Sequence, residues 1–179
     1  KWRHKSDTLH AGRNDVMAYY KFCRRLGHRP ENIRVLTTPK LGLEDFVRAE
    51  QEMHPEASSK VASAGRGARV RKKVEAYFEA LVHDKATKAN IEEQLAWLAR
   101  MCDSEGTEAG SPSGFLAFSG HGTRIDGELA LCPCDVGKTF TRALRVRDVS
   151  RRFSAGAKEN LTVVLDCCFA AAREGEPES

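Results

Sequence analysis

A histidine stands between two glycines at the end of an apolar run. The stretch FLAFSGHG, residues 115–122, is typical of a buried strand that ends at His121. Glycines at 120 and 122 would let a substrate backbone approach the imidazole closely. An imidazole can take up and return a proton near neutral pH. His121 is therefore a candidate general base, provided that the fold brings a nucleophile to it.

Two adjacent cysteines end a second apolar run. Residues 160–168, NLTVVLDCC, are almost wholly apolar up to Asp166, as in a strand buried on both faces. A cysteine attacks as its thiolate, which a neighbouring base can generate, and the same base can then protonate a leaving amine. If the two strands are parallel neighbours, their carboxyl ends meet. Asp166, Cys167 and Cys168 would then lie beside His121.

Helices and strands alternate around these two runs. Apolar periodicity predicts helices at residues 15–26, 44–53, 70–82, 89–101 and 145–153, and strands at 33–38, 115–118 and 161–167. Small and polar residues predict loops at 55–68 and 103–113, and an irregular segment at 122–140 in which RIDGELALCPCDV forms a short hairpin or a loop. Gly27 is the expected stop of the first helix, and Asn90 is the expected N-cap of the fourth. We therefore expect an α/β fold whose three strands are adjacent and parallel, with the ligand site outside their carboxyl ends.

The composition is that of an ordinary globular domain. The chain has 179 residues, of which 41% are hydrophobic and 30% are charged, enough for one sizeable core. No apolar run approaches the roughly 20 residues of a membrane span, and the N-terminus lacks the apolar core of a secretory signal. Six cysteines are too sparse for a disulfide scaffold. We expect a reducing, cytoplasmic setting and no membrane partner.

A basic cluster between residues 60 and 73 carries much of the net charge of +4. Such a cluster can contact nucleic-acid phosphates. No aromatic stacking residues are interleaved with it, however, and the chain has no nucleic-acid-binding motif. We expect the cluster to be a solvated loop or helix face, and we expect no nucleic-acid partner.

FLAFSGHG followed by VVLDCCFA resembles the caspase-like cysteine peptidases of peptidase family C14, and the metacaspases most closely. The 47 residues from His121 to Cys168 are similar to the caspase spacing of about 50. LCPCD, residues 131–135, resembles the Pro-x-Asp loop of the family. The resemblance covers most of the chain as one catalytic domain, residues 1–179, with residues 40–85 interpreted as an insertion.

The resemblance implies an α/β, caspase-like sandwich, with a mainly parallel sheet flanked by helices. It also implies that this sandwich is incomplete in this chain, because the family has a strand before its first helix and at least two strands after the cysteine. On this interpretation the chain is the large-subunit portion of an enzyme activated by proteolytic processing. Its expected partners are a protein or peptide substrate and its own C-terminal small-subunit portion. Basic residues are the candidate self-cleavage sites: Arg66, Arg69, Arg71, Lys72 and Arg173.

The resemblance also assigns the catalytic roles. Cys168 is the nucleophile, and His121 is the general base. The backbone N–H groups of Gly122 and Cys168 form the oxyanion hole, which holds the developing negative charge. Cys167 is assigned to packing.

The same resemblance implies which residues select the substrate. Asp166 lies at the floor of the pocket for the substrate residue before the cut, and Ser119 lies on the opposite wall. A carboxylate there can accept charge-assisted hydrogen bonds from arginine or lysine. The resemblance therefore implies cleavage after Arg or Lys.

Three alternatives stand beside this interpretation. Although no cofactor and no metal ligand are expected, some metacaspases bind calcium through carboxylates, and Asp126, Glu128 and Asp148 lie in the corresponding region. A zinc site would combine Cys132 and Cys134 with His121 and Cys168, although Cys-x-Cys is not the usual zinc-knuckle spacing. The third alternative is a non-catalytic caspase-like module that binds or scaffolds partners.

Overall fold

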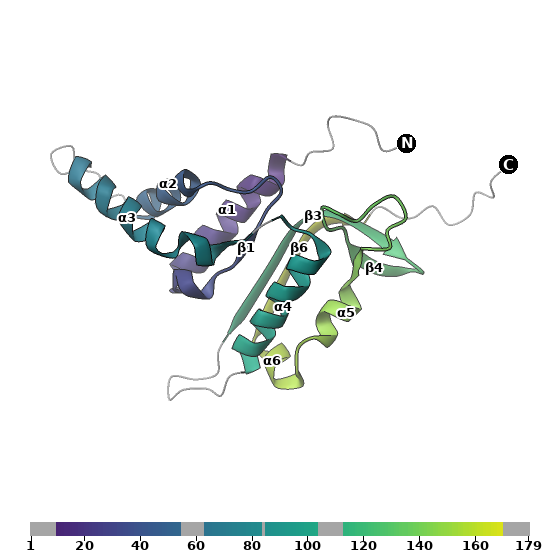
Figure 1. The fold of residues 1–179 in the computed structure, drawn as a ribbon. Coiled ribbons are helices and arrows are strands. Elements are labelled where there is room, and N and C mark those ends of the chain that lie inside the picture. The colour runs from purple at the N-terminus through teal and green to yellow at the C-terminus, as the bar shows by residue number, and fades with distance from the viewer. Residues whose placement is uncertain (1–9, 55–62, 84, 104–112, 170–179) are drawn as a thin grey trace. The chain divides into compact units, whose positions relative to one another are not determined.

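The computed structural model of the chain describes residues 10–54, 63–83, 85–103 and 113–169 (Figure 1). It divides the chain into two compact units, Lys1–Lys85 and Ala86–Ser179, here called unit 1 and unit 2. In the part of the chain that the structure describes, no helix has both the length and the apolar character needed to cross a membrane. Each unit has its own hydrophobic core.

Unit 1 packs helices around short parallel strands. Its elements are α1 (His10–Arg25), the 3-10 turn η1 (Pro30–Asn32), β1 (Val35–Leu36), α2 (Leu43–Met53), α3 (Ser63–Leu81) and β2 (Val82–His83). β1 pairs with β2 in parallel. Phe46 of α2 is fully buried at the centre of the core, and the ring of Tyr20 from α1 meets it edge-on at a centroid distance of 5.0 Å. The segment 40–85 thus supplies much of the hydrophobic core of unit 1, and α1 supplies the rest of the helical packing.

A buried carboxylate joins two helices of unit 1. Glu50 on α2 is 3% exposed, and its Oε1 accepts hydrogen bonds from the Tyr20 hydroxyl at 2.7 Å and from Arg24 Nε at 2.8 Å. Burial alone would raise the pKa of Glu50, but the hydrogen bonds from Arg24 and Tyr20 outweigh it and hold this pKa below its ordinary value. The ion pair between Glu50 and Arg24 therefore ties α1 to α2 inside the core.

Unit 2 is built on a mixed four-stranded sheet with the strand order β5-β4-β3-β6. β3 and β6 are parallel, from the pair Gly114–Leu161 to the pair Gly122–Phe169. β4 is antiparallel to both β3 and β5. The elements are α4 (Lys88–Asp103), β3 (Gly114–Ile125), β4 (Glu128–Leu131), β5 (Leu144–Arg145), α5 (Val146–Arg151), α6 (Ala155–Glu159) and β6 (Leu161–Phe169).

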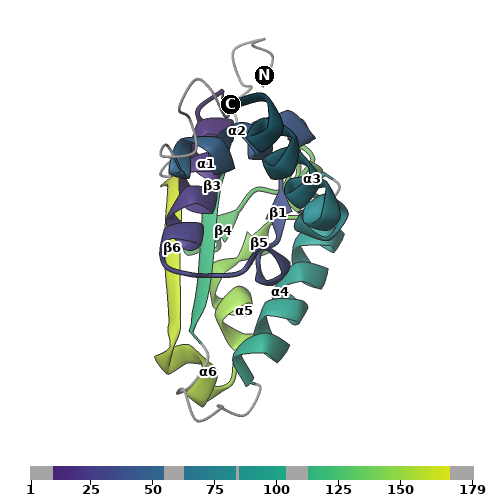
Figure 2. The same ribbon diagram turned by 90° about the vertical axis from the view of Figure 1, so that its left-hand side faces the viewer.

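Helices α4, α5 and α6 cover one face of this sheet (Figure 2). On β3, Leu116 and Phe118 pack against this helical layer, and on β6, Leu165 and Cys167 do the same. Because side chains alternate across a strand, the residues between these four belong to the other face. This alternation confirms the packing role predicted for Cys167.

The observed sheets differ from the mainly parallel sheet that the sequence predicted. β3 runs well past the predicted end at 118 and turns at Asp126 and Gly127 into an antiparallel hairpin with β4, which confirms the predicted hairpin. β1 is shorter than the predicted strand at 33–38 and pairs with β2 in a separate sheet, so the predicted row of three adjacent parallel strands is wrong for the described residues. The ladder ends early because the Thr37 hydroxyl accepts a hydrogen bond from Leu41 N at 3.1 Å, and Pro39 has no N–H to continue it.

The predicted helices are present, but several of their ends differ from the prediction, and α1 begins at His10 rather than at residue 15. α3 begins at Ser63, where a loop was predicted up to residue 68. Packing of α3 against α2, with Gly67 facing Gln51, outweighs the low helix propensity of its glycines. α4 begins at Lys88, and the Thr87 hydroxyl, rather than Asn90, accepts the capping hydrogen bond, from Asn90 N at 3.3 Å. Gly27 has φ +90°, as expected for a residue that ends α1.

Candidate active site

The β3–β6 ladder brings the predicted site residues to one place. His121 pairs with Cys168, and two residues earlier Ser119 pairs with Asp166. Neighbouring strands lie about 4.8 Å apart, so the backbones of each pair lie side by side. Figure 2 shows β3 and β6 running next to each other along their length. The four residues thus occupy adjacent positions near the carboxyl end of the parallel pair.

His121 is open to solvent at this position. Its side chain is exposed, whereas Ser119 is half-buried. The backbone carbonyl of His121 accepts a hydrogen bond from Cys132 N at 2.9 Å, which joins the end of β4 to β3 at the candidate base. Gly120, next to His121, allows the Phe118 ring to pack closely against the strand, because a Cβ at residue 120 would lie 3.1 Å from that ring. The imidazole is therefore held on a paired strand and remains accessible to a substrate.

Gly122 lies between two partners in the sheet. It pairs with Leu131 of β4 on one side and with Phe169 of β6 on the other. This position places its backbone next to the His121–Cys168 pair. The side chain of Cys168 lies outside the described part of the structure. The assignment of the backbone N–H groups of Gly122 and Cys168 to an oxyanion hole remains a prediction.

The loop after β4, which carries the Pro-x-Asp sequence, is hydrogen-bonded to the residues at the start of α4. Cys134 N donates to the Ala86 carbonyl at 2.9 Å. Asp135 accepts two hydrogen bonds, from Lys88 N at 2.8 Å and from an Arg142 guanidinium nitrogen at 3.0 Å. The bond from Lys88 N, followed by that from Arg142, lowers the pKa of Asp135 below its usual range.

Asp135 thus anchors the segment that contacts His121 through Cys132. Sequence reasoning identified this aspartate only as a family landmark and missed its role at the start of α4. The local sequence holds no signal for that role, because Asp135 and Lys88 are 47 residues apart.

The carboxylates considered for calcium are all engaged with arginines. Asp126 accepts from Arg145 at 2.7 Å, Glu128 accepts from the same Arg145 at 3.1 Å, and Asp148 pairs with Arg151 at 3.3 Å. Among the described residues, no group of three or more His, Cys, Asp or Glu side chains is arranged to hold a metal ion. The zinc alternative includes Cys168, whose side chain lies outside the described ones.

The basic cluster is largely helical. Arg69, Arg71 and Lys72 lie on α3, and Arg71 forms ion pairs with Glu44 of α2 and Glu75 of α3. A peptidase binds its substrate in an extended form, so this helix disfavours the self-cleavage sites predicted in a loop. Arg173, the other candidate, lies outside the described residues.

Comparison with known proteins gives one match. A family model described as the caspase domain matches residues 3–179. No curated protein and no solved structure matches the chain. The match covers both units, including residues 40–85.

Proposed function

Because the chain belongs to the caspase domain family, whose members are cysteine peptidases, we propose that it hydrolyses peptide bonds with Cys168 and His121. The observation that carries this proposal is the pairing of these two residues across β3 and β6. The exposed side chain of His121 also supports it, because a substrate must reach the general base.

The proposed reaction needs one proton carrier and one nucleophile. His121 takes the proton of the Cys168 thiol, and the thiolate attacks the carbonyl carbon of the substrate. The backbone N–H groups of Gly122 and Cys168 donate to the resulting oxyanion. His121 then protonates the leaving amine as the C–N bond breaks, and water hydrolyses the thioester that remains.

We assign substrate selection to the neighbouring pair, Ser119 and Asp166. Both precede the reactive residues by two positions, so each belongs to the same face of the sheet as His121. Asp166 is exposed and can bind a substrate cation. A carboxylate at this position favours arginine or lysine as the substrate residue before the cut, and it repels aspartate there.

The proposed partner is the protein's own C-terminal small-subunit portion, which proteolytic processing would separate from this chain. This part of the proposal rests on the family resemblance. It is also supported by the place of β6, which is at the edge of the four-stranded sheet formed by the described residues. Edge strands offer unpaired N–H and C=O groups to a further strand.

A peptide panel tests this proposal on the full-length gene product. The peptides differ only in the residue before the cut, which is arginine, lysine, aspartate or alanine. We expect kcat/KM to be highest for arginine and lysine. Asp166→Asn should lower kcat/KM for the arginine peptide about 10- to 100-fold, the usual value of a hydrogen bond between charged groups. Glu159→Gln, at an exposed position of α6, is the matched control and should leave kcat/KM unchanged.

Two results would contradict parts of the proposal. A preference for aspartate, or an unchanged arginine preference in Asp166→Asn, would refute the assignment of Asp166. No hydrolysis of any peptide, together with retained binding of protein partners, would favour the non-catalytic scaffold instead.

A further inference from the structure

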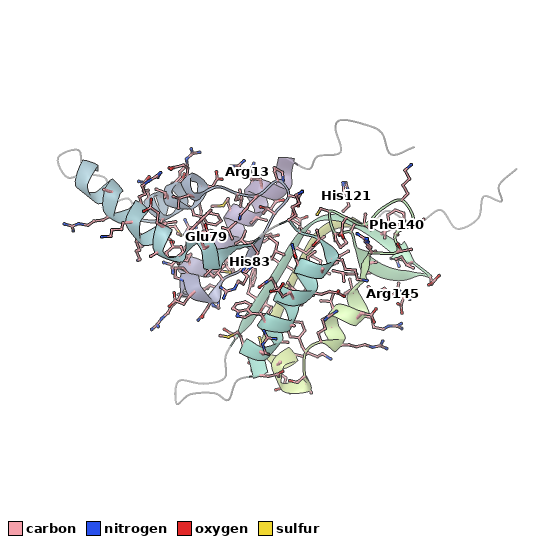
Figure 3. The ribbon with its side chains drawn as sticks, in the orientation of Figure 1. Arg13, Glu79, His83, His121, Phe140 and Arg145 are labelled. Atoms are coloured by element: carbon pink, nitrogen blue, oxygen red, sulfur yellow. The ribbon has the colours of Figure 1, made fainter. Side chains whose placement is uncertain are left out.

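A hollow of about 580 Å³ lies beside the β3–β4 hairpin of unit 2. This volume is within the range of small-ligand sites. Three segments that are far apart in the chain line it: the start of α4 with Lys88, the end of β3 with Arg124, and the loop before β5 with Thr139, Phe140 and Thr141. Phe140 is labelled in Figure 3. A ligand in this hollow would contact all three segments.

The hollow is separate from the candidate active site. On β3, Leu116 and Phe118 pack against the helices of unit 2. Because side chains alternate across a strand, Arg124 belongs to this helix-covered face, whereas His121 belongs to the other face. Lys88, at the start of α4, also lines the hollow from the helical side. A ligand bound by Arg124 and Lys88 therefore lies across the sheet from the residues proposed for peptide hydrolysis.

The acidic side chains in the lining already have basic partners. Asp126 binds Arg145 at 2.7 Å, and Asp148 binds Arg151 at 3.3 Å. No other aspartate or glutamate lines the hollow in the part of the chain that the structure describes. Each carboxylate thus has a cation beside it, and neither needs a cationic ligand.

Two basic side chains in the lining, by contrast, have no acidic partner among the described residues. Lys88 is half-buried, and only its backbone N–H is engaged, by the Asp135 carboxylate at 2.8 Å. Arg124 donates to the Gly127 carbonyl at 2.9 Å, which uses one of the five N–H groups of a guanidinium. Ammonium and guanidinium groups are donors only. The hollow therefore offers two positive charges to an acceptor that carries negative charge.

The loop before β5 adds a polar rim and an apolar wall. The Thr139 and Thr141 hydroxyls lie 3.3 Å apart. When one of them donates to the other, the proton of the second remains available to a ligand. Phe140 lies between them in sequence and also lines the hollow. Its φ of 53° is uncommon for a bulky residue, and backbone strain of this kind is concentrated at functional sites.

A phosphate monoester matches this combination of groups. Its charge near pH 7 is about −1.5 to −2, and it has three strong acceptor oxygens. Lysine binds phosphate as a point charge, and the fork of an arginine binds two of its oxygens. We propose that the hollow binds a small organic phosphate monoester, with the phosphate held by Lys88 and Arg124 and the rest of the ligand against Phe140. This site is additional to the proposed peptidase site and does not depend on it.

Three small probes test the chemistry of the site on the full chain. Phenyl phosphate has both the phosphate and a ring, inorganic phosphate lacks the ring, and benzoate has the ring but a single charge. Ligand-observed NMR titrations measure the three dissociation constants. We expect phenyl phosphate to bind about fivefold more tightly than inorganic phosphate, because of the contact with an aromatic ring. It should also bind about fivefold more tightly than benzoate, because benzoate has one charge fewer for the two cations.

Paired substitutions identify the two cations. Lys88→Gln with Arg124→Gln should weaken the binding of phenyl phosphate about tenfold, the combined value of two partly exposed ion pairs. Each single variant should weaken it about threefold, so the test does not depend on the stability of the double variant. Arg100→Gln with Lys158→Gln removes the same two charges from exposed positions outside the lining and is the matched control. Circular dichroism melting confirms that each variant is folded.

A further variant tests the apolar wall. Phe140→Ala should leave the dissociation constant of inorganic phosphate unchanged and remove the advantage of phenyl phosphate over it. Equal binding of phenyl phosphate and inorganic phosphate by the wild type would overturn the assignment of an organic ligand.

The remaining outcomes decide whether the hollow is a phosphate site. Equal binding of benzoate and phenyl phosphate would overturn the proposal. So would an affinity for phenyl phosphate that the Lys88 and Arg124 substitutions leave unchanged, or that the control pair lowers equally. A loss confined to the Lys88 and Arg124 variants would support the site, and this result would stand even if the chain hydrolyses no peptide.

Discussion

His121 on β3 and Cys168 on β6 are partners across two parallel strands. Their register is continuous from Gly114–Leu161 to Gly122–Phe169, and apolar side chains of both strands pack against the helices of unit 2. A shift of one residue would turn this apolar set to the other face of the sheet. The core packing of unit 2 therefore fixes which residue of β6 lies beside the histidine.

The start of β3 should be sensitive to the smallest added side chain. A Cβ at Gly114 would lie 2.6 Å from Cys102 Sγ and 2.9 Å from Leu161 Cδ1. We expect Gly114→Ala to lower the free energy of unfolding by about 1–3 kcal/mol, because buried overpacking forces neighbours to shift. Urea unfolding measures this loss, and Ser113→Ala, at an exposed position, is the control. A loss no larger than that of the control would contradict the observed packing.

Asp135 should stabilise the start of α4 through its hydrogen bond from Lys88 N at 2.8 Å. We expect Asp135→Ala to lower the free energy of unfolding by about 1 kcal/mol, as loss of a helix N-terminal cap does. Asp148→Ala removes only an exposed ion pair and should cost less than about 0.5 kcal/mol.

The pH dependence of this contribution has a definite sign. Because the bonds from Lys88 N and Arg142 lower the folded-state pKa of Asp135, its stabilisation is complete above the unfolded pKa near 3.9. It should disappear as the pH falls through the lower, folded value. Denaturation series between pH 2 and pH 7 on the wild type and Asp135→Ala should therefore converge at the acidic end. Curves that stay parallel would show that the carboxylate does not act through its charge.

Glu50 should be essential to unit 1. Glu50→Gln would leave the Arg24 guanidinium, whose side chain is 15% exposed, without its carboxylate. We expect a loss of about 3 kcal/mol, since an unpaired buried charge is strongly destabilising. Glu52→Gln, which removes an ion pair with Lys21 at an exposed carboxylate, should cost much less than Glu50→Gln. Thermal melting compares the two variants, and equal effects would argue against the buried network.

The features predicted correctly from the sequence are those that the spacing of apolar residues indicates. The apolar runs at 115–118 and 161–167 both form strands, and these strands are parallel neighbours as expected. The helix that ends at Gly27 is also present. These features depend on local patterns of side chains, which a single sequence displays.

Other features depend on contacts between distant segments. The partner of β1 is β2, which two helices separate from it along the chain, and no local pattern indicates that pairing. Thr87, not Asn90, caps α4, because the helix begins at Lys88, one residue before the predicted start at 89. Asp135 contacts Lys88 only through the tertiary fold. For the candidate site, residue types and order were visible in the sequence, whereas the hydrogen bond from Cys132 N to the His121 carbonyl was not.

Selective alkylation tests the central claim, that Cys168 is a nucleophile activated by His121. The probe is a short peptide ending in an arginine chloromethyl ketone, from which an attacking thiolate displaces chloride. Burial raises the pKa of the Cys23 and Cys102 thiols, so these should react slowly. Cys134 is exposed and serves as the internal reference for an unactivated thiol.

The measurement is the rate of labelling at each cysteine, followed by peptide-mapping mass spectrometry in the wild type and in His121→Ala. The account predicts that Cys168 is labelled at least tenfold faster than Cys134, and that His121→Ala removes this difference. Equal labelling of Cys168 and Cys134 in the wild type, or fast labelling of Cys168 that persists in His121→Ala, would contradict it.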